Sequence, residues 1–407
     1  MNRQLSLFDE MIEQPEMTTE LYANSFPTIQ QRDLFLANNK VDYTTLFKMV
    51  EEMNELGIKV DLEKLNAHIY QAATDKAHAV SDWYRELEDQ GLIKVDYSKT
   101  KELHKLFFET LALPVVKTTA KGAPALDKKA LDVLAELNPL AEIFKRIKST
   151  QRIHKMLTNI LEAVENGRIY PQLHVDGAAS GRFTCDGVNI QQFPESFRDI
   201  IVPDKGVLVY IDYSQIEYRV QATLAHDERA IQAFRDGIDA HSQLAALLNI
   251  TREKAKVVNY AVSYGMTAYG LAIELGISED AATKIIRDYW SAKDLVAKKR
   301  ADVISWSRAR GFVPTIYGFS RTLDTIEKDD QIWSTSIQGS AADLMKKCMT
   351  DIYKYFELTS SGRVLANIHD ALLIDLYDIT RLDDLKNIFR NVDDRFVLDV
   401  DAKVNTF

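Results

Sequence analysis

Two apolar segments, predicted to be buried strands, lie far apart in the chain and constrain its fold more than any other feature. GVLVYIDYS spans residues 206–214, and RVLANIHDALLIDLY spans 363–377 with a tight turn at His369–Asp370. Residues 215–310 between them have helical periodicity, and so have residues 42–165 before them. We therefore expect a helical domain, strands, a helical insert and further strands. An insert that divides a sheet domain often creates a cleft, and clefts bind substrates.

The composition indicates a globular protein with a large core, since 46% of the 407 residues are hydrophobic and 27% are charged. The formal net charge of −10 argues against a broad polyanion-binding surface but is compatible with local basic clusters. No apolar run could span a bilayer, and no signal peptide is evident. Cys185 and Cys348 lack the spacing of a metal site, which indicates reduced thiols. We expect a cytoplasmic monomer with no membrane partner.

An aspartate stands at the end of each strand segment. Asp212 ends VLVYID, and Asp370 lies at the turn of NIHDALLID. Two carboxylates brought together from distant positions are costly unless a cation lies between them, and hard oxygen ligands suit Mg²⁺. Two such ions could stabilise the attacking and leaving oxygens of a phosphoryl transfer. For each acid alone, a strand-end cap or a plain turn residue is the alternative.

In the segment TREKAKVVNYAVSYG, Arg252, Lys256, Tyr260 and Tyr264 recur at every fourth position. On a helix they would share one face, with the two cations about 6 Å apart along the axis. That distance fits the charges of a triphosphate, and Tyr260 would then lie near a sugar or a base. The alternative is an amphipathic surface helix, which accounts for the two cations better than for the two tyrosines.

Several segments resemble the family A DNA polymerases, the bacterial DNA polymerase I type. The three polymerase motifs of that family are matched by DYSQIEYR at 212–219, REKAKVVNYAVSYG at 252–265 and HDA at 369–371. The resemblance covers residues 41–407 and keeps the family's order and spacing. It also includes ASGRFTCDGVNIQQFP at 179–194, DAHSQLAA at 239–246, SIQGSAADLMK at 336–346, GIKVDLEKLNAHI at 57–69 and KGAPALDKKALDVL at 121–134.

This resemblance implies a right-hand polymerase fold of class α+β, with an antiparallel palm sheet, helical fingers and a helical thumb. Residues 41–165 would form the thumb and connecting helices, 166–235 and 311–407 the palm, and 236–310 the fingers. Residues 1–40 are polar and weakly patterned, and they are predicted to be a flexible tail.

The resemblance also implies template-directed addition of deoxynucleotides to a primer 3′-OH, with primer–template DNA and dNTPs as partners. Asp212, Asp370 and the backbone carbonyl of Tyr213 would bind two Mg²⁺ ions. Lys256 would neutralise or protonate the leaving pyrophosphate. The triphosphate would be held by Arg252, Lys256 and His241.

Other residues acquire roles by the same resemblance. Tyr260 would pack on the nucleotide sugar, Glu217 would exclude a ribose 2′-OH, and Tyr264 would stack near the templating base. The residues expected to contact the primer–template are Arg182, Asn189, Gln191 and Gln338, with Arg198 and His369 near the primer end.

The sequence departs from the family pattern at Ala371, where a glutamate usually follows His-Asp. An alanine cannot act on a metal or water as a carboxylate does, so metal affinity or rate is expected to suffer. Asp375 is not expected to substitute, because alternation from Asp370 would point it to the other face of its strand. About forty residues precede the thumb region, too few for a 3′–5′ exonuclease or 5′ nuclease domain, so neither activity is expected in this chain.

The N-terminal segment MNRQLSLFDE contains QLSLF, which resembles the peptide that binds bacterial sliding clamps. One glutamine to hydrogen-bond and three apolar side chains to fill a pocket fit a tail that tethers an enzyme to DNA. A bacterial or phage-infected cell would be the setting. The alternative is a start segment that packs on the protein itself. The predicted clamp-binding residues are Gln4, Leu5, Ser6, Leu7 and Phe8.

Two other functions stay open. A single-subunit RNA polymerase shares the two aspartates, although Glu217 and the NYxxxYG pattern favour deoxynucleotides. A catalytically weak, clamp-bound DNA-binding protein derived from a polymerase would account for Ala371.

Overall fold

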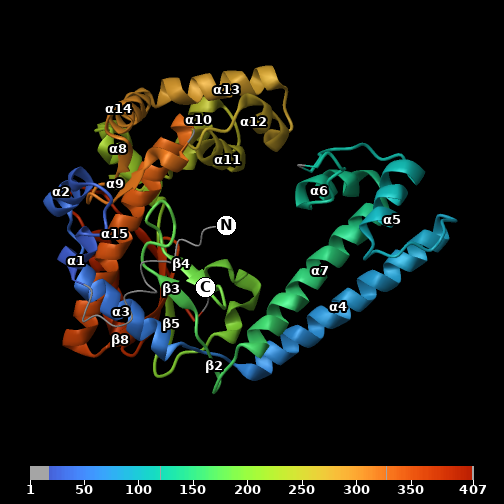
Figure 1. Ribbon diagram of the computed structural model, residues 1–407, viewed down its shortest axis with the longest axis horizontal. Helices are drawn as coiled ribbons and strands as arrows, with labels where there is room; N and C mark the ends of the chain where they lie inside the picture. The colour runs from blue at the N-terminus through green and yellow to red at the C-terminus, as the bar shows by residue number, and fades with distance from the viewer. Residues whose placement is uncertain (1–17, 120, 327, 406–407) are drawn as a thin grey trace. The chain divides into compact units, whose positions relative to one another are not determined.

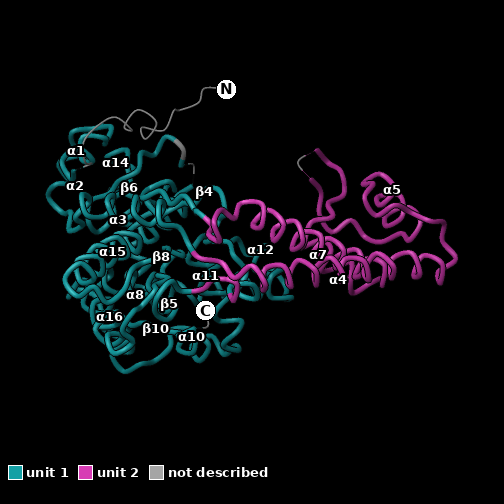
Figure 2. The backbone as a smooth tube through the Cα atoms, turned by 90° about the horizontal axis from the view of Figure 1, so that it is seen from below, with its two compact units in different colours: residues 1–58, 170–198, 203–407 teal, residues 59–169, 199–202 magenta. Residues whose placement is uncertain are grey.

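The computed structural model describes residues 18–119, 121–326 and 328–405. The chain divides into two compact units (Figure 2). Unit 1 contains the chain up to residue 58 together with 170–198 and 203–407, and unit 2 contains 59–169 and 199–202. Helix α3 (Tyr43–Leu56) belongs to unit 1, where it buries Leu46 and Met49.

Unit 1 contains a four-stranded antiparallel sheet with the strand order β10–β5–β9–β8. Two of its strands, β5 and β8, are labelled in Figure 1. The first predicted apolar segment forms β5 (Val207–Tyr213), and the second forms the hairpin of β8 (Gly362–Ile368) and β9 (Ala371–Leu376). Strand β10 (Val400–Val404) was not predicted, because VDAKV is short and mostly polar.

One face of this sheet is covered by helices. The Tyr213 ring lies 5.0 Å from the Phe389 ring of α16 (Leu382–Arg390), centroid to centroid, and its hydroxyl donates to the Phe389 carbonyl at 3.0 Å. The 31-residue helix α15 (Asp329–Thr359) lies on this side too, with Cys348 beside Tyr213. Because side chains alternate along a strand, Asp212 points to the opposite face.

The predicted helical insert follows β5. It begins with α8 (Ile216–Leu224) and α9 (Glu228–Arg235) and ends with α14 (Asp294–Arg310). Between them, four helices share a core that includes Leu244, Val258, Leu271 and Tyr289. These helices are α10 (Ala240–Leu248), α11 (Arg252–Ser263), α12 (Ala268–Leu275) and α13 (Glu279–Ala292).

Unit 2 is helical, as predicted. Its long helices α4 (Leu62–Asp89) and α7 (Pro139–Glu162) pack against each other, and α6 (Lys128–Leu137) packs on α7. The core centres on Trp83, whose indole N–H donates to the Val95 carbonyl at 2.9 Å. Helix α5 (Thr100–His104) continues as a π-helical segment over Lys105–Thr110.

Three small two-stranded sheets complete the strands: β1 (Ile58–Lys59) with β2 (Arg168–Ile169), β3 (Gln172–His174) with β4 (Thr184–Asp186), and β6 (Phe312–Pro314) with β7 (Ser320–Thr322). RIYPQLHV was predicted as one strand, but it divides at Pro171, which has no N–H to donate to a ladder. In the described part of the chain, no helix combines the length and apolar character needed to cross a membrane.

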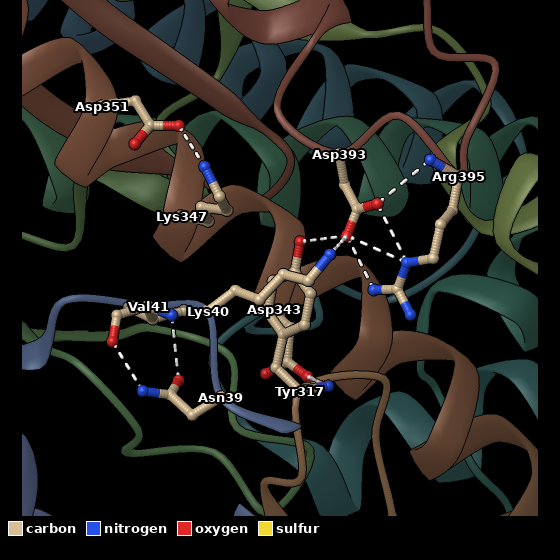
Figure 3. Close-up of polar contacts among 9 residues, drawn as sticks. All are labelled: Asn39, Lys40, Val41, Tyr317, Asp343, Lys347, Asp351, Asp393 and Arg395. Carbon is tan, nitrogen blue, oxygen red and sulfur yellow. Dashed lines mark hydrogen bonds and ion pairs between the residues drawn. The ribbon is translucent and has the colours of Figure 1, made fainter. Parts of the chain in front are cut away.

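The sequence predicts a flexible tail for residues 1–40, but residues 18–40 contain two packed helices, α1 (Thr19–Ala23) and α2 (Ile29–Asn38). Phe35 is fully buried, and the Tyr22 ring stacks on Tyr43 at 4.2 Å. Lys40 then donates to the buried carboxylate of Asp393 at 3.0 Å (Figure 3). Aromatic anchors spread over two short helices do not form a clear helical period, which is why the sequence analysis missed this segment.

Asp375 has a structural role at the far end of β9. Its partner in the register is Leu208, four residues before Asp212 on β5, so Asp375 and Asp212 point to the same face of the sheet. Asp370 lies in the turn before β9, so the strand alternation expected from it does not extend to Asp375. About 13 Å of strand separates Asp375 from Asp212. The Asp375 carboxylate is fully buried and accepts the backbone N–H groups of residues 204–206 at 2.8 to 3.2 Å. The Asp375 carboxylate therefore stabilises the backbone bend at residues 204–206. It is too distant to replace a carboxylate at residue 371.

Replacing Asp375 with asparagine should lower the free energy of unfolding by about 2 kcal/mol, because hydrogen bonds to a charged acceptor are lost. Urea denaturation followed by circular dichroism measures this. The matched variant D383N removes a carboxylate whose side chain is 88% exposed, and it should change little. Equal stability of D375N and D383N would contradict the structural role.

Candidate active site

A pocket of about 530 Å³ in unit 1 gathers residues from β5, the β8–β9 turn, α8, α10, α11 and β10. Most residues predicted from the sequence line it: Arg182, Asp212, Tyr213, Glu217, His241, Arg252, Lys256, Tyr260, His369 and Asp370. Five predicted residues are not part of its lining: Asn189, Gln191, Arg198, Tyr264 and Gln338. A smaller cavity of about 190 Å³, lined by residues of α3, α15 and β8, shares no residue with the pocket and holds no predicted site residue.

Two left-handed residues shape the backbone around the acids. Gln215 has a φ of 56° and reverses the chain between β5 and α8, which places Glu217 in the first turn of that helix. His369 has a φ of 60° at the first position of the β8–β9 turn. The backbone N–H of Tyr213 donates to the carbonyl of Asp370 at 3.1 Å, so the two acid-bearing segments are joined directly.

The two predicted metal-binding acids sit in an unfavourable environment. Burial, and then the charges of Asp370 and Asp401, raise the pKa of Asp212 to about 7. Burial also raises the pKa of Asp370. Asp212 Oδ1 is buried and has no hydrogen-bond partner among the described residues. A hard cation would satisfy this oxygen and offset the repulsion, so these residues fit Mg²⁺.

The acids alone do not form a complete coordination shell. Within the described ranges, no three His, Cys, Asp or Glu side chains form a group that could hold a metal ion. Magnesium usually keeps several waters and binds one or two carboxylates plus substrate phosphates. The pair Asp212 and Asp370 matches that mode of binding.

Arg252, one of the two predicted triphosphate cations, is already paired. Its Nε and Nη2 donate to the two carboxylate oxygens of Asp239 at 2.9 and 3.1 Å. Although burial raises it, hydrogen bonds from Arg252, Ser242 and Gln215 hold the pKa of Asp239 well below its usual range. Lys256, one turn further along α11, is exposed. On α11, the charge of Arg252 is therefore neutralised by Asp239, whereas the charge of Lys256 is accessible in the pocket.

His241 is buried behind these cations, and its neighbours fix its protonation. Lys293 donates to Asn259 Oδ1 at 2.8 Å, so the amide nitrogen of Asn259 must be the donor to His241 Nδ1, 3.0 Å away. Burial lowers the pKa of His241, and the charges of Arg252 and Lys256 lower it further. The ring is therefore neutral with its proton on Nε2, where it can donate a hydrogen bond. Asn259 belongs to the NYxxxYG pattern but was given no role, and nothing in the local sequence marked Lys293.

Glu217, the predicted sugar gate, forms an ion pair with Arg182 at 2.5 Å. Burial raises the pKa of Glu217, although the charge of Arg182 opposes this. Tyr260 lies beside the pair of Tyr218 and His241, with ring centroids 5.5 and 5.9 Å away. The three rings therefore pack against one another in the pocket that also holds Glu217.

The family model for DNA polymerase family A matches residues 62–406 of this chain. The chain belongs to DNA polymerase family A. It is 31% identical to the DNA polymerase I of Caldicellulosiruptor bescii over 376 residues, which are 81% of this chain and 42% of that protein. It is 25% identical to the thermostable DNA polymerase I of Thermus aquaticus over 399 residues, 90% of this chain and 47% of that protein. The chain thus spans less than half the length of these relatives.

A solved structure confirms the predicted fold class. The POL domain of Pol1 from M. smegmatis, in complex with DNA primer–template and dNTP, superposes with a TM-score of 0.82 at 27% identity, over 90% of this chain and 70% of that one. The right-hand, α+β polymerase fold expected from the sequence is therefore correct. The antiparallel sheet and the helical insert of this family A chain are the parts that build the pocket.

The five predicted residues outside the pocket lining of this family A polymerase have other contacts. Asn189 caps the backbone N–H of Gln191, whose side chain donates to the Asn367 carbonyl at 3.4 Å. Arg198 lies over the Tyr210 ring at 5.5 Å. The remaining two are Tyr264, which ends α11, and Gln338, on α15.

Sequence reasoning gave no role to Asp239 beside the pocket, nor to Ser214, Gln215 and Asp401 in its lining. Asp239 was quoted within a family-like segment but given no role, and Asp401 lies on the unpredicted strand β10. Asp401 could have been found only from the strand register, because nothing in its local sequence distinguishes it.

The raised pKa of Asp212 predicts how metal-free stability depends on pH. The native state retains a proton that the unfolded chain loses between about pH 4 and 7, so ionised Asp212 destabilises the native state at pH 8. D212N should therefore raise the thermal midpoint at pH 8 by roughly a few degrees. This gain should fall to nearly zero by about pH 3, below both pKa values, where the wild-type carboxyl is largely protonated in both states. Calorimetry in the presence of a chelator measures it, and a pH-independent difference would contradict it.

Proposed function

We propose that this chain is a template-directed DNA polymerase that adds deoxynucleotides to a primer 3′-OH. The observation that carries the proposal is the convergence of Asp212 and Asp370 with Arg252 and Lys256 in one pocket. Carboxylates for metal and cations for a triphosphate are the two requirements of nucleotidyl transfer. We further propose that unit 2 is the thumb, the helices α10–α14 are the fingers, and the four-stranded sheet is the palm.

The residues act by position and charge. Asp212, Asp370 and the Tyr213 carbonyl would hold two Mg²⁺ ions, which when bound activate the 3′-OH and neutralise the phosphates. Arg252 exchanges Asp239 for the triphosphate, and Lys256 lies next to it to stabilise or protonate the pyrophosphate. His241 donates Nε2–H to a phosphate oxygen.

The same pocket supports selection of the sugar. Glu217 is partly buried and held by Arg182, so its side chain cannot swing aside freely to admit a 2′-OH. Tyr260 offers a face for the sugar, and Tyr264 at the end of the helix is proposed to stack near the templating base. The primer–template would be contacted by Arg182, Asn189, Gln191 and Gln338, and the primer end by Arg198 and His369.

Primer extension on a short labelled duplex with Mg²⁺ tests the proposal. Wild-type protein should extend with dNTPs, and D212N should be slower by at least about 10²-fold, because metal ions supply several kcal/mol of transition-state stabilisation. D383N is the matched control. Failure of the wild type to extend would favour a DNA-binding protein, and equal use of rNTPs would favour an RNA polymerase. Shortening of the labelled primer without dNTPs would overturn the expectation that this chain has no nuclease.

We also propose that the enzyme is tethered to a bacterial-type sliding clamp through residues 4–8, within a bacterial or phage-infected cytoplasm and as a monomer. These residues lie outside the described part of the chain, so the proposal rests on the QLSLF sequence alone.

On a long primed single strand with a bacterial clamp and its loader, products per binding event should lengthen. The double variant L7A/F8A should lose this gain and keep its clamp-free rate, because only the apolar anchors of the peptide are removed. M11A/I12A removes two apolar residues from the same segment outside the motif, and it should behave as wild type. Equal products with and without the clamp would refute the tether.

A further inference from the structure

Asp212 lies between two neighbouring strands, and the residues opposite it differ in charge. In the register of the sheet, Ala371 of β9 is opposite Asp212 on one side and Asp401 of β10 is opposite it on the other. Directly opposed residues of antiparallel strands share a face, with their Cβ atoms about 5 Å apart. The three side chains therefore form one row across the sheet: a carboxylate, a carboxylate and a methyl group.

Asp401 is placed to act in the pocket. It lines the pocket together with Asp212 and Asp370. One of its oxygens, Oδ2, accepts a hydrogen bond from Ser214 Oγ at 3.0 Å. Ser214 follows Asp212 by two residues and extends from the same strand end, so this contact holds the Asp401 carboxylate beside Asp212. No hydrogen bond to the other oxygen of Asp401 is present among the described residues. Asp212 Oδ1 is a buried oxygen that also lacks a hydrogen-bond partner in the described part of the chain.

We propose that Asp401 supplies the third carboxylate of the cation site, in place of the side chain that Ala371 lacks. The inference rests on the proposed function, because it concerns the same cation site. A residue directly opposite the central aspartate on either neighbouring strand lies within about 4.5–5.5 Å of it, so the sheet allows a carboxylate on β10 to serve where β9 has none. Asp401 acts as a positioning residue through the hydration shell of the cation, since Mg²⁺ retains several waters.

The test is Mn²⁺ binding to the full 407-residue chain, measured as loss of the free Mn²⁺ signal in electron paramagnetic resonance. D401N should weaken binding by about tenfold, the lower range for loss of an outer-shell partner. D401E should stay within about twofold of wild type because it keeps the carboxylate. D383N, which removes an exposed carboxylate on α16, should also bind as wild type, and it controls for net charge. Wild-type affinity in D401N would overturn the proposal.

A second variant tests whether the two positions are equivalent. Adding A371E to D401N should restore Mn²⁺ affinity, because a carboxylate returns beside Asp212 from the other strand. A folded double variant that binds as weakly as D401N would overturn the claim that Asp401 replaces a carboxylate at residue 371, and the single variant decides the role of Asp401 however the double variant folds.

The binding assay separates this inference from the proposed function. If wild-type protein failed to extend primers but D401N lost Mn²⁺ affinity, the proposed role of Asp401 in the cation site would be supported and the proposed polymerase activity would be contradicted. If wild-type protein extended primers and D401N bound Mn²⁺ as wild type does, the polymerase activity would be supported and the proposed role of Asp401 would be contradicted. In extension assays, D401N should raise the half-saturating Mg²⁺ concentration by about tenfold and change the rate at saturating Mg²⁺ much less.

Discussion

The antiparallel pairing of β5 with β9 and β10 is the constraint on which the rest of the structure depends. It fixes Asp212 between two strands and brings Asp370 and Asp401 into the same pocket. Carboxylates at this separation repel one another, and burial adds to the cost. The sheet can hold them because its opposite face is packed: Ile211 and Leu372 are fully buried, and Tyr213 is locked to α16. Apolar packing on one face thus maintains a repulsive arrangement on the other, which a bound cation or a proton on Asp212 would relieve.

The second part of the pocket depends on polar contacts rather than on apolar packing. Asp239 accepts hydrogen bonds from Gln215 in the turn after β5, from Ser242 in α10 and from Arg252 in α11. One carboxylate therefore joins the acid-bearing strand to the helix that carries the cations. A phosphate that recruits Arg252 must compete with this carboxylate. If the proposed nucleotide site is correct, nucleotide binding and the position of α11 are coupled through the Asp239 side chain.

The N-terminal helices support the same region from another direction. Tyr22 of α1 donates to Asp176 at 2.7 Å, and Phe26 packs on Phe319 with ring centroids 5.9 Å apart. Phe319 also lies so close to Gly181 that an added Cβ would be 2.9 Å from its ring. Arg182 follows directly and forms the ion pair with Glu217. A segment predicted to be a tail thus supports the loop that carries Arg182, the partner of the proposed sugar gate Glu217.

The sequence by itself determined the local features of this protein. The apolar runs at 206–214 and 363–377 specified strands ending in aspartates, and the four-residue spacing from Arg252 specified a helix with its cations on one face, because these signals depend only on neighbouring residues. Tertiary structure alone decided which polar groups meet. Asp401, Asp239 and Asn259 acquire their partners through strand register and helix packing, and Asp375 shares a face with Asp212 against the simple alternation from Asp370. Such contacts join residues far apart in the chain, and no local pattern records them.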